Sequence, residues 1–432
     1  MLPEDEFSTL DLNRRRTLLA DQLPWYLGEI ARTAGLVSRN TLKQALPSAM
    51  SANDLVAVGT ILKFLDPKLE HVESYRISPT SDLKGWCDKS GIICEVLQEA
   101  QTVKIAATSP YTQEATYATD PVRFASIPGG CWVVGRDFAI GTDGTILKDT
   151  GHWPISIARS GDPHFYVADI ELIAQTAPEK SIYIDDDVFF LSGPVLHHFG
   201  HWIIDFLPRL RALNRYGKSN LKVATLESLS NIQRDTLSLC GVQPNDLISC
   251  KPRIQYKFRT LHVCQTGQSM PPNPENVDFV RSKLYHSGAT SQPMQGAGAR
   301  IFAARGKVGT RNIENADEVS RLLAEEGFIQ VDFARLSVAE QQEVMANARI
   351  VIGVYGSNLF ALYYAPPGCT VIALMPPGHD DPTIMHTCYM LQMRHQFLQC
   401  EAALVTEAKK WKVDTDIRVD CQELRRRLRE LS

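Results

Sequence analysis

Apolar and polar positions alternate most regularly in the C-terminal third of the chain, between residues 299 and 374. Short apolar runs rich in β-branched residues predict strands there, and apolar residues spaced three and four apart predict helices. The expected strands cover residues 299–304, 328–333, 350–354 and 370–374, and the expected helices cover residues 317–326, 337–348 and 357–364. Strands and helices that alternate in this way are typical of a parallel sheet with crossover helices. Such a sheet binds its ligands at the carboxyl ends of its strands.

The central part of the chain also predicts an α/β domain, with shorter strands and more turns. Trp202, Phe206 and Leu210 recur at helical spacing and predict an amphipathic helix over residues 200–215. A second helix is expected near residues 229–240, and the expected strands cover residues 131–140, 145–147, 165–172, 181–190, 221–225 and 260–264. The stretch 265–298 is rich in Pro, Gly, Ser, Asn and Gln, so we expect a linker there that contains one short helix-like piece.

These patterns divide the chain into four parts. We expect residues 1–120 to form a mixed, largely helical extension and residues 121–285 to form a first α/β domain. Residues 299–405 are expected to form a second, Rossmann-like domain, and residues 406–432 an amphipathic C-terminal helix. A length of 432 residues agrees with two domains plus extensions, because single cores rarely grow beyond about 300 residues.

Charge and cysteine content narrow the class of protein. The net charge of −4, from 45 basic and 49 acidic residues, gives no field that would attract nucleic acid. No run of about 18 apolar residues predicts a membrane span, and the N-terminus has acidic residues where a signal peptide needs basic ones. The ten cysteines are scattered, with none at Cys-x-x-Cys spacing, which favours reduced thiols over a disulfide framework or a zinc site. We therefore expect a cytoplasmic protein.

The segment 348–374 predicts a phosphate site at a helix start. A β-branched strand ends at Val354, the chain turns through Tyr355 and Gly356, and a helix opens at Ser357 and Asn358. A helix N-terminus presents unpaired backbone N–H groups and the positive end of the helix dipole, which suits a diphosphate. The alternative is a Gly-Ser turn that binds no phosphate.

The segment 300–319 predicts a basic loop at the end of a neighbouring strand. The loop holds Arg305, Lys307 and Arg311, and Asn315 stands before the next helix. Because strand ends of one sheet converge, these cations are expected to meet the helix start at Ser357. A departing nucleoside diphosphate builds up negative charge, which such a cluster stabilises. The alternative is a solvated, charged loop.

The segment 193–213 predicts a histidine–carboxylate pair on a helix. His201 and Asp205 are four residues apart and share one helix face, which His198 and Arg209 extend as a polar stripe. A carboxylate that orients and charges an imidazole makes it a general base. The alternative is a helix-surface pair with a structural role.

These segments, in this order, resemble glycosyltransferase family 61 and the capsular polysaccharide biosynthesis group, above all the bacterial members. The similarity covers roughly residues 180–400 and depends on an ordered set of short motifs. The matching residues are His198-Phe199-Gly200-His201-Trp202 with Asp205 and Arg209; Arg305, Arg311 and Asn315; Leu336-Ser337-Val338 with Glu340-Gln341; Ala348, Gly353, Gly356, Ser357 and Leu359; and Pro366-Pro367-Gly368 with Val371.

The resemblance implies a GT-B-like fold, in which two Rossmann-like domains face a cleft, preceded here by the largely helical extension. It implies an inverting, metal-independent transfer of a sugar from a nucleotide-sugar donor to a glycan or lipid-linked glycan, in surface polysaccharide biosynthesis. The donor would bind mainly to the second domain, at Arg305, Lys307, Arg311, Asn315 and the segment from Tyr355 to Asn358. The acceptor would bind mainly to the first domain, near His198 and Arg209, with His201 and Asp205 as catalytic residues.

Two positions depart from the pattern of the family. Many relatives have a histidine where this chain has Tyr355, and an acidic residue where it has Ala373. Both positions are expected near the nucleotide, so the identity of the donor does not follow from the resemblance. These departures leave open a non-catalytic protein that binds a glycan or nucleotide. A second alternative is a structural subunit of a polysaccharide-assembly complex that acts through its N-terminal region.

Two further segments resemble functional motifs, one for binding a metal and one for contacting a membrane. Asp185-Asp186-Asp187 imitates the Asp-x-Asp motif that holds Mg²⁺ or Mn²⁺ in the other major glycosyltransferase fold, but we favour an acidic turn and expect no metal or other cofactor. The C-terminal helix combines Leu424 and Leu428 with several arginines. It could touch the inner face of a membrane as a peripheral contact, but we favour a helix packed across the other domain with its arginines in water.

Overall fold

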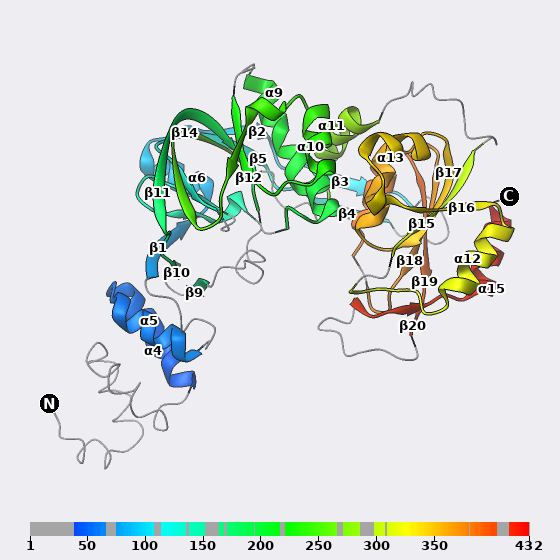
Figure 1. Cartoon of the computed structure of the whole chain (residues 1–432), viewed down its shortest axis with the longest axis horizontal. Helices are drawn as coiled ribbons and strands as arrows, with labels where there is room; N and C mark the ends of the chain where they lie inside the picture. Colours follow the sequence, from blue (N-terminus) through cyan, green and yellow to red (C-terminus); the bar gives the residue numbers. More distant parts are fainter. Residues whose placement is uncertain are drawn as a thin grey trace, which may run out of the picture.

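The structure is a computed structural model, whose described residues form two large sheets and two further sheets of two strands each (Figure 1). It describes residues 39–65, 75–107, 114–134, 138–151, 164–167, 171–193, 195–216, 221–265, 271–285, 298–306, 309–379, 381–403 and 414–431. We call the part before residue 286 the first half of the molecule, and the part from residue 298 the second half.

The second half is built on a five-stranded parallel sheet. Its strands in chain order are β15 (Ala299–Ala304), β16 (Phe328–Asp332), β17 (Ala348–Val354), β18 (Thr370–Met375) and β19 (Arg394–Gln399). They lie in the order β16-β15-β17-β18-β19, which is the doubly wound order 2-1-3-4-5. The direction of the chain across the sheet reverses between β15 and β17, and ligands bind at the carboxyl ends of the strands at such a point. The four strands predicted from the sequence are confirmed; β19 was not predicted.

Helices cover both faces of this sheet. One face is packed by α12 (Ala316–Glu325) and α15 (Cys421–Glu430), which bury Val319, Leu323, Leu424 and Leu428 against it. The opposite face is packed by α13 (Val338–Met345), the 3₁₀ helix η8 (Ser357–Tyr364) and α14 (Thr383–Met390). The C-terminal helix therefore packs on its own half, beside α12, and the expectation that it crosses the other domain is wrong.

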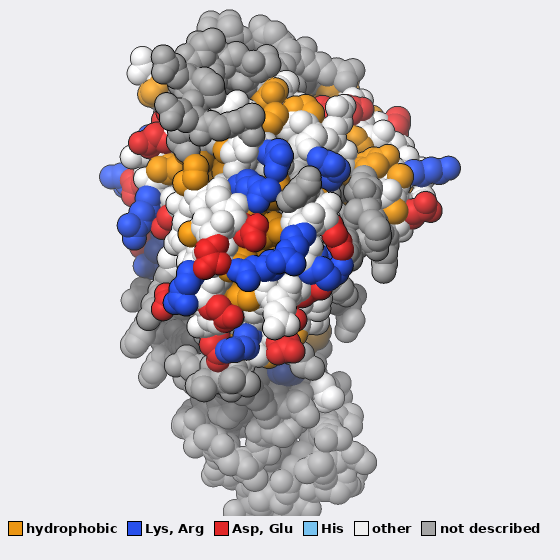
Figure 2. Space-filling view, turned by 90° about the vertical axis from the view of Figure 1, so that its right-hand side faces the viewer, with side chains coloured by type: hydrophobic (Ala, Val, Ile, Leu, Met, Phe, Trp, Pro, Cys, Tyr) orange, Lys and Arg blue, Asp and Glu red, His pale blue; other side chains and the backbone are white. Residues whose placement is uncertain are grey.

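The arginines of α15 are largely engaged in ion pairs. Arg425 pairs with Glu325 at 2.8 Å, Arg426 pairs with Glu423 at 2.7 Å, and the buried Arg427 also bonds Glu423. Figure 2 shows this side of the molecule, on which basic and acidic side chains lie interspersed. A contact between this helix and a membrane is an alternative that the structure does not test.

The first half contains a parallel core with antiparallel additions. The parallel strands are β11 (Lys180–Phe190), β12 (Lys222–Leu226), β13 (Leu247–Cys250) and β14 (Ile254–Gln265), in the order β13-β12-β11-β14. This is the 3-2-1-4 order of a Rossmann half. Antiparallel strands β5 (Val122–Pro128) and β6 (Cys131–Val133) pair with β14 and extend the sheet. The first half is thus Rossmann-like only between β11 and β14.

The N-terminal region differs from the largely helical extension that the sequence predicts. Helices α4 (Arg39–Ser51) and α5 (Leu55–Leu65) agree with a helical extension. From Tyr75 onward, however, the described chain is mostly strand: β1 (Tyr75–Ser81), β2 (Cys94–Gln98), β3 (Thr102–Ile105) and β4 (Ala115–Ala118), with one helix, α6 (Leu83–Ser90). Strands β1 and β2 pair within the sheet of the first half, so this sheet begins well before residue 121.

A helix in the expected linker joins the halves. Helix α11 (Pro274–Leu284) starts at Asn273, whose side chain accepts a hydrogen bond from the Glu275 backbone N–H at 3.0 Å. It contacts the helical segment 202–210 in the first half and both η8 and α14 in the second. One hydrophobic core runs through this junction and contains residues of both sheets, such as Phe189 and Val371.

Candidate active site between the two sheets

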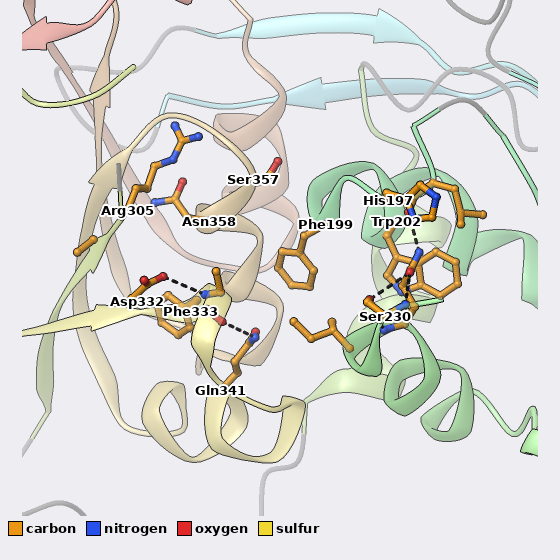
Figure 3. A pocket seen from close by; sticks show the side chains of 16 residues that line it. His197, Phe199, Trp202, Ser230, Arg305, Asp332, Phe333, Gln341, Ser357 and Asn358 are labelled. Carbon is orange, nitrogen blue, oxygen red and sulfur yellow. Dashed lines mark hydrogen bonds between the residues drawn. The ribbon is translucent and has the colours of Figure 1, made fainter. Parts of the chain in front are cut away.

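A cavity of about 370 Å³ lies between the two halves (Figure 3). This is within the usual size range of ligand pockets. The residues that line it from the first half are Leu196, His197, Phe199, Trp202, Ser230, Ile232 and Gln233. Those from the second half are Ala304, Arg305, Gly306, Asp332, Phe333, Ala334, Gln341, Ser357 and Asn358. The second wall is therefore made by the carboxyl ends of β15 and β16 and by the start of η8.

Two arginines and a glycine meet at the point where the sheet order reverses. Arg305 follows β15, and Gly356 follows β17 after one residue. A Cβ atom on Gly356 would lie 3.4 Å from Arg305 Nη1 and 3.5 Å from Arg311 Nη1. Gly356 has a φ of 155°, a conformation that favours glycine. The convergence predicted from the two sequence segments is confirmed for Arg305, Arg311 and Gly356.

The charge of Arg305 is only partly balanced by the protein. Its Nη1 is buried and has no hydrogen-bond partner among the described residues. Burial and the neighbouring Arg311 lower the pKa of Arg305, while Asp414 raises it. A buried donor without a partner costs roughly 1–3 kcal/mol, and more when it is charged. An anion that accepts a hydrogen bond from Arg305 would remove this cost.

Arg311 is held in place by the backbone of the turn. Its Nη1 donates to the Tyr355 carbonyl oxygen at 2.9 Å, and its Nη2 lies 3.8 Å from Asp414 Oδ1. Arg311 itself has a φ of 57°, which non-glycine residues seldom adopt. The C-terminal segment that contains Asp414 thus helps to fix the second guanidinium beside the first.

The start of η8 adds polar groups to the same wall. Ser357 and Asn358 both line the cavity, and Asn358 Nδ2 donates to the Ala303 carbonyl oxygen at 3.0 Å. The Asn358 Oδ1 is buried and has no hydrogen-bond partner among the described residues. The predicted helix start is confirmed, although its hydrogen bonding is 3₁₀ rather than α.

The predicted histidine–carboxylate pair forms in the first half. His201 Nδ1 and Asp205 Oδ2 are 2.7 Å apart; the Asp205 side chain is 2% exposed and that of His201 is 22% exposed. Residues Trp202–Phe206 form a short π-helix between an α turn at Phe199–His201 and a 3₁₀ turn at Leu207–Leu210. Such π segments are frequent at functional sites. The contact with Asp205 fixes the orientation of the His201 imidazole, and a general base needs a fixed orientation of this kind.

His201 lies at the junction of the halves rather than in the cavity wall. Within the described chain, Phe199 and Trp202 of the same helical segment line the cavity and His201 does not. Its neighbour Gly200 packs on η8: a Cβ there would lie 2.8 Å from the Phe360 ring and 3.3 Å from Ser357 Oγ. Gly200 therefore lets the segment that contains His201 approach the start of η8 closely.

Other predicted site residues have different surroundings. Asn315 donates to the Val419 carbonyl oxygen at 2.9 Å and accepts from the Val419 N–H at 3.0 Å, so it anchors the C-terminal segment. Arg209 is 4% exposed and donates to the backbone carbonyl oxygens of Asp205, Thr150 and Ser192. His198 is exposed, with its ring 6.0 Å from that of His201. Lys307 lies outside the described residues.

The acidic triplet is engaged by an arginine. Asp185 and Asp187 lie on β11, and Arg259 Nε is 3.1 Å from Asp187 Oδ1 while its Nη1 is 3.4 Å from Asp185 Oδ1. Arg259 lowers the pKa of Asp187. These carboxylates lie on an exposed face of the first sheet and do not line the cavity.

The two positions that depart from the family pattern are buried. Tyr355 is 4% exposed and its ring lies 4.4 Å from that of His379; burial and Asp381 raise its pKa. Ala373 is fully buried within β18. Among the described residues, neither side chain lines the cavity. Tyr355 contributes instead through its carbonyl oxygen, which holds Arg311.

Several cavity residues were missed from the sequence. Asp332 ends β16, and the rule that ligands bind at strand ends could have identified it. Ser230 and Gln233 form a capping box at the start of α10 (Asn231–Leu239). That motif predicts a helix start but not that it faces the other half. Gln341 donates to the Phe333 carbonyl oxygen at 3.0 Å and supports the loop after β16.

Comparison with known proteins gives one family. Residues 199–372 match the family model described as Glycosyltransferase 61. No curated protein matches the chain. No helix in the described part of the chain has the length and apolar character needed to cross a bilayer. The matched region begins at Phe199 beside His201 and extends into β18, so it includes both the basic cluster and the histidine–carboxylate pair. Over residues 199–372, which include most of the residues that line the cavity, the chain is therefore similar to glycosyltransferase family 61.

Proposed function

We propose that the protein is an inverting, metal-independent glycosyltransferase of GT-B-like arrangement. It transfers a sugar from a nucleotide-sugar donor to a glycan or lipid-linked glycan on the cytoplasmic side of a membrane, in the synthesis of a surface polysaccharide. The family match supports the reaction class. The parallel sheet of the second half and the parallel core of the first, with a cavity between the halves, support the two-domain arrangement.

The buried and unpaired Nη1 of Arg305 is the observation on which the donor site depends. The diphosphate of the donor binds at the ends of β15 and β17, where Arg305, Arg311 and the backbone of Gly356 converge. Two guanidinium groups balance the charge that grows on the leaving phosphate, which is the task a divalent cation has in other transferases. Lys307 belongs to the same loop and is proposed to add a third cation.

His201 accepts the proton in the proposed reaction. The acceptor hydroxyl oxygen forms a bond to the anomeric carbon while the bond from that carbon to the donor phosphate oxygen breaks. The hydroxyl proton moves to Nε2 of His201, and Asp205 at 2.7 Å stabilises the imidazolium through Nδ1. The leaving nucleoside diphosphate keeps the electron pair and stays on the arginines. Attack opposite the leaving group inverts the anomeric configuration.

A screen of nucleotide sugars tests this proposal. Purified protein is incubated with each donor, with and without a panel of glycan acceptors, and released nucleoside diphosphate is measured. We expect one donor to be consumed. Asp205→Asn should lower turnover of that donor by about 10²–10⁴-fold, because it removes the charge that supports the base, while the affinity for the nucleoside diphosphate changes by less than about twofold.

A protein that only binds nucleotides or glycans would give a different result. It would bind a nucleoside diphosphate but show neither transfer nor slow donor hydrolysis. If Asp205→Asn abolished nucleotide binding and kept turnover, the assignment of roles to the two halves would be wrong.

A further inference from the structure

We propose that Asp332 recognises the ribose hydroxyls of the donor nucleotide, so that the cavity selects a ribonucleoside diphosphate. This inference rests on the proposed donor site and adds the orientation of the ligand in it. The diphosphate lies at Arg305, the ribose lies over Asp332, and the base lies against the apolar wall.

The register of the sheet places Asp332 beside the arginine. In the parallel pairing of β15 and β16, Asp332 is the partner of Ala304, and Arg305 is the next residue. Both strands therefore end at the same level of the cavity wall. In doubly wound folds, an acidic residue at the end of the second strand commonly binds ribose hydroxyls while the phosphates lie at the first.

The two opposite charges do not neutralise each other. No ion pair joins Arg305 and Asp332 in the described part of the structure. Asp332 Oδ1 instead accepts from the Ala334 N–H at 3.2 Å, and its Oδ2 lies 3.1 Å from Arg335 Nε. In Figure 3 the Arg305 side chain extends away from Asp332. The cavity thus has a cationic end and an anionic part, because each side chain faces a different region.

This polarity fixes which part of a ligand fits where. A phosphate at Asp332 would meet a like charge, whereas a neutral diol can donate two hydrogen bonds to a carboxylate. Gly306, between the two charged residues, would place even a Cβ atom no nearer than 3.8 Å to Asp332 Oδ2. A ligand chain can therefore pass from Arg305 to Asp332 over bare backbone.

The remaining wall suits a base. Phe199, Phe333, Leu196 and Ile232 contribute apolar and aromatic surface from both halves. In Figure 3 the Phe199 ring projects from the first half toward the second, and Phe333 follows Asp332 directly. A nucleoside consists of a flat base and a ribose diol. Aromatic surface beside a carboxylate is complementary to these two parts.

The test compares ribose and deoxyribose forms of one ligand. The nucleoside diphosphate that binds most tightly among those with the four common bases is titrated by calorimetry, together with its 2′,3′-dideoxy form and inorganic pyrophosphate. We expect the wild-type protein to prefer the ribose form by about 10–100-fold, as for hydrogen bonds to a charged group. Asp332→Asn should reduce this preference to about threefold or less and leave pyrophosphate affinity within about twofold.

Two features keep the variant interpretable. Asn is a good N-cap residue, so Asp332→Asn can still accept from the Ala334 N–H and preserve the loop. Arg335 is 83% exposed, and Arg335→Gln serves as the matched control because it removes only the partner of Asp332. Arg335→Gln should keep the ribose preference of the wild-type protein.

Three outcomes would overturn the inference. One is an Asp332→Asn variant that retains the full preference for ribose. A second is a variant that binds pyrophosphate and both nucleotides more tightly by the same factor, since this would show simple repulsion of phosphate by the carboxylate. A third is a wild-type protein that binds no nucleoside diphosphate, which would also remove the donor site. Ribose preference without any sugar transfer would instead refute the proposed reaction and support the role of Asp332.

Discussion

Arg209 and Arg305 each lie in the segment that follows the first parallel strand of its sheet, and their surroundings differ completely. Arg209 is 4% exposed and donates to three backbone carbonyl oxygens. Arg305 is half-buried, its Nη1 has no hydrogen-bond partner among the described residues, and Arg311 lies beside it. One charge is satisfied by the backbone, and the other is the one that we propose binds the diphosphate of the donor.

The same contrast separates the two halves. In the first half, Arg259 pairs with Asp185 and Asp187. In the second half, the cluster of Arg305 and Arg311 has a partial counterion in Asp414, 3.8 Å from Arg311. Charged residues in a motif therefore become functional or structural according to which backbone oxygens and carboxylates fold against them. This comparison gives four predictions.

The largest effect is expected for Arg209→Met. The substitution keeps much of the side-chain volume but leaves three buried carbonyl oxygens without their donor. We expect the free energy of unfolding to fall by roughly 3–5 kcal/mol. Chemical denaturation measures it. A loss below about 1 kcal/mol would show that Arg209 is not a structural residue.

Arg305→Met should have the opposite profile. It removes a buried charge that lacks a full counterion, so the stability of the ligand-free protein should stay equal or rise. The affinity for a nucleoside diphosphate should fall by about 10–100-fold, because a charged hydrogen bond is lost. Calorimetric titration and thermal unfolding of the same sample measure the two effects. A destabilised variant with unchanged affinity would reverse the comparison.

Gly200→Ala tests the contact between the halves. A methyl group 2.8 Å from the Phe360 ring must displace that ring or the helix, and overpacking of this kind should cost about 1–2 kcal/mol. Turnover should fall as well, since His201 is the next residue. The matched control is Gly309→Ala, because no described atom lies within 4 Å of a Cβ there. Equal behaviour of the two variants would argue against a tight junction at Gly200.

The smallest expected effect is a change in the stability of the folded protein with pH. Burial lowers the pKa of His395 in the second half from 6.5 to about 3, so the folded protein binds fewer protons than the unfolded chain as the pH falls below about 7. Stability contributed by the neutral ring is therefore lost on acidification, by roughly 0.5–1 kcal/mol between about pH 7 and pH 6. Burial raises the pKa of Asp149 in the first half to about 6, which acts in the opposite direction.

Denaturation curves at the two pH values separate these groups. Asp149→Asn should lose more stability on acidification than the wild-type protein, and His395→Phe should lose less. Identical pH dependence in all three proteins would show that neither group is shifted in the folded state.

The sequence predicted the second half better than the first, and particular residues show why. The strand 350–354 is fully buried and four of its five residues are β-branched, and residues 301–304 form a buried apolar run. Both patterns give a strong local signal. The strands β1 and β2 pair with β8 (Ile146–Leu147) and β5, which lie far along the chain, and β7 (Ala139–Ile140) and β8 have only 2 residues each. The sequence around these strands therefore contains little information about the sheet. The sheet of the first half therefore starts earlier than expected.

The sequence predicts the contacts of those site residues whose positions are fixed by a helix or by the order of neighbouring strands. The spacing of His201 and Asp205 fixes their contact on a helix, and the order of strands fixes the meeting of Arg305 with Gly356. Asn315 and Arg209 could not be assigned in this way, because their partners Val419 and Thr150 lie 104 and 59 residues away in the chain. Ser230 and Gln233 enter the cavity only because the two halves pack together, which no local pattern encodes.

The most direct test of the account is a crystal structure of the protein with the nucleoside diphosphate that it binds most tightly. We expect phosphate oxygens within hydrogen-bond distance of Arg305 Nη1 and of the backbone N–H groups at the start of η8. A diphosphate bound elsewhere, with Arg305 still unpaired, would contradict it.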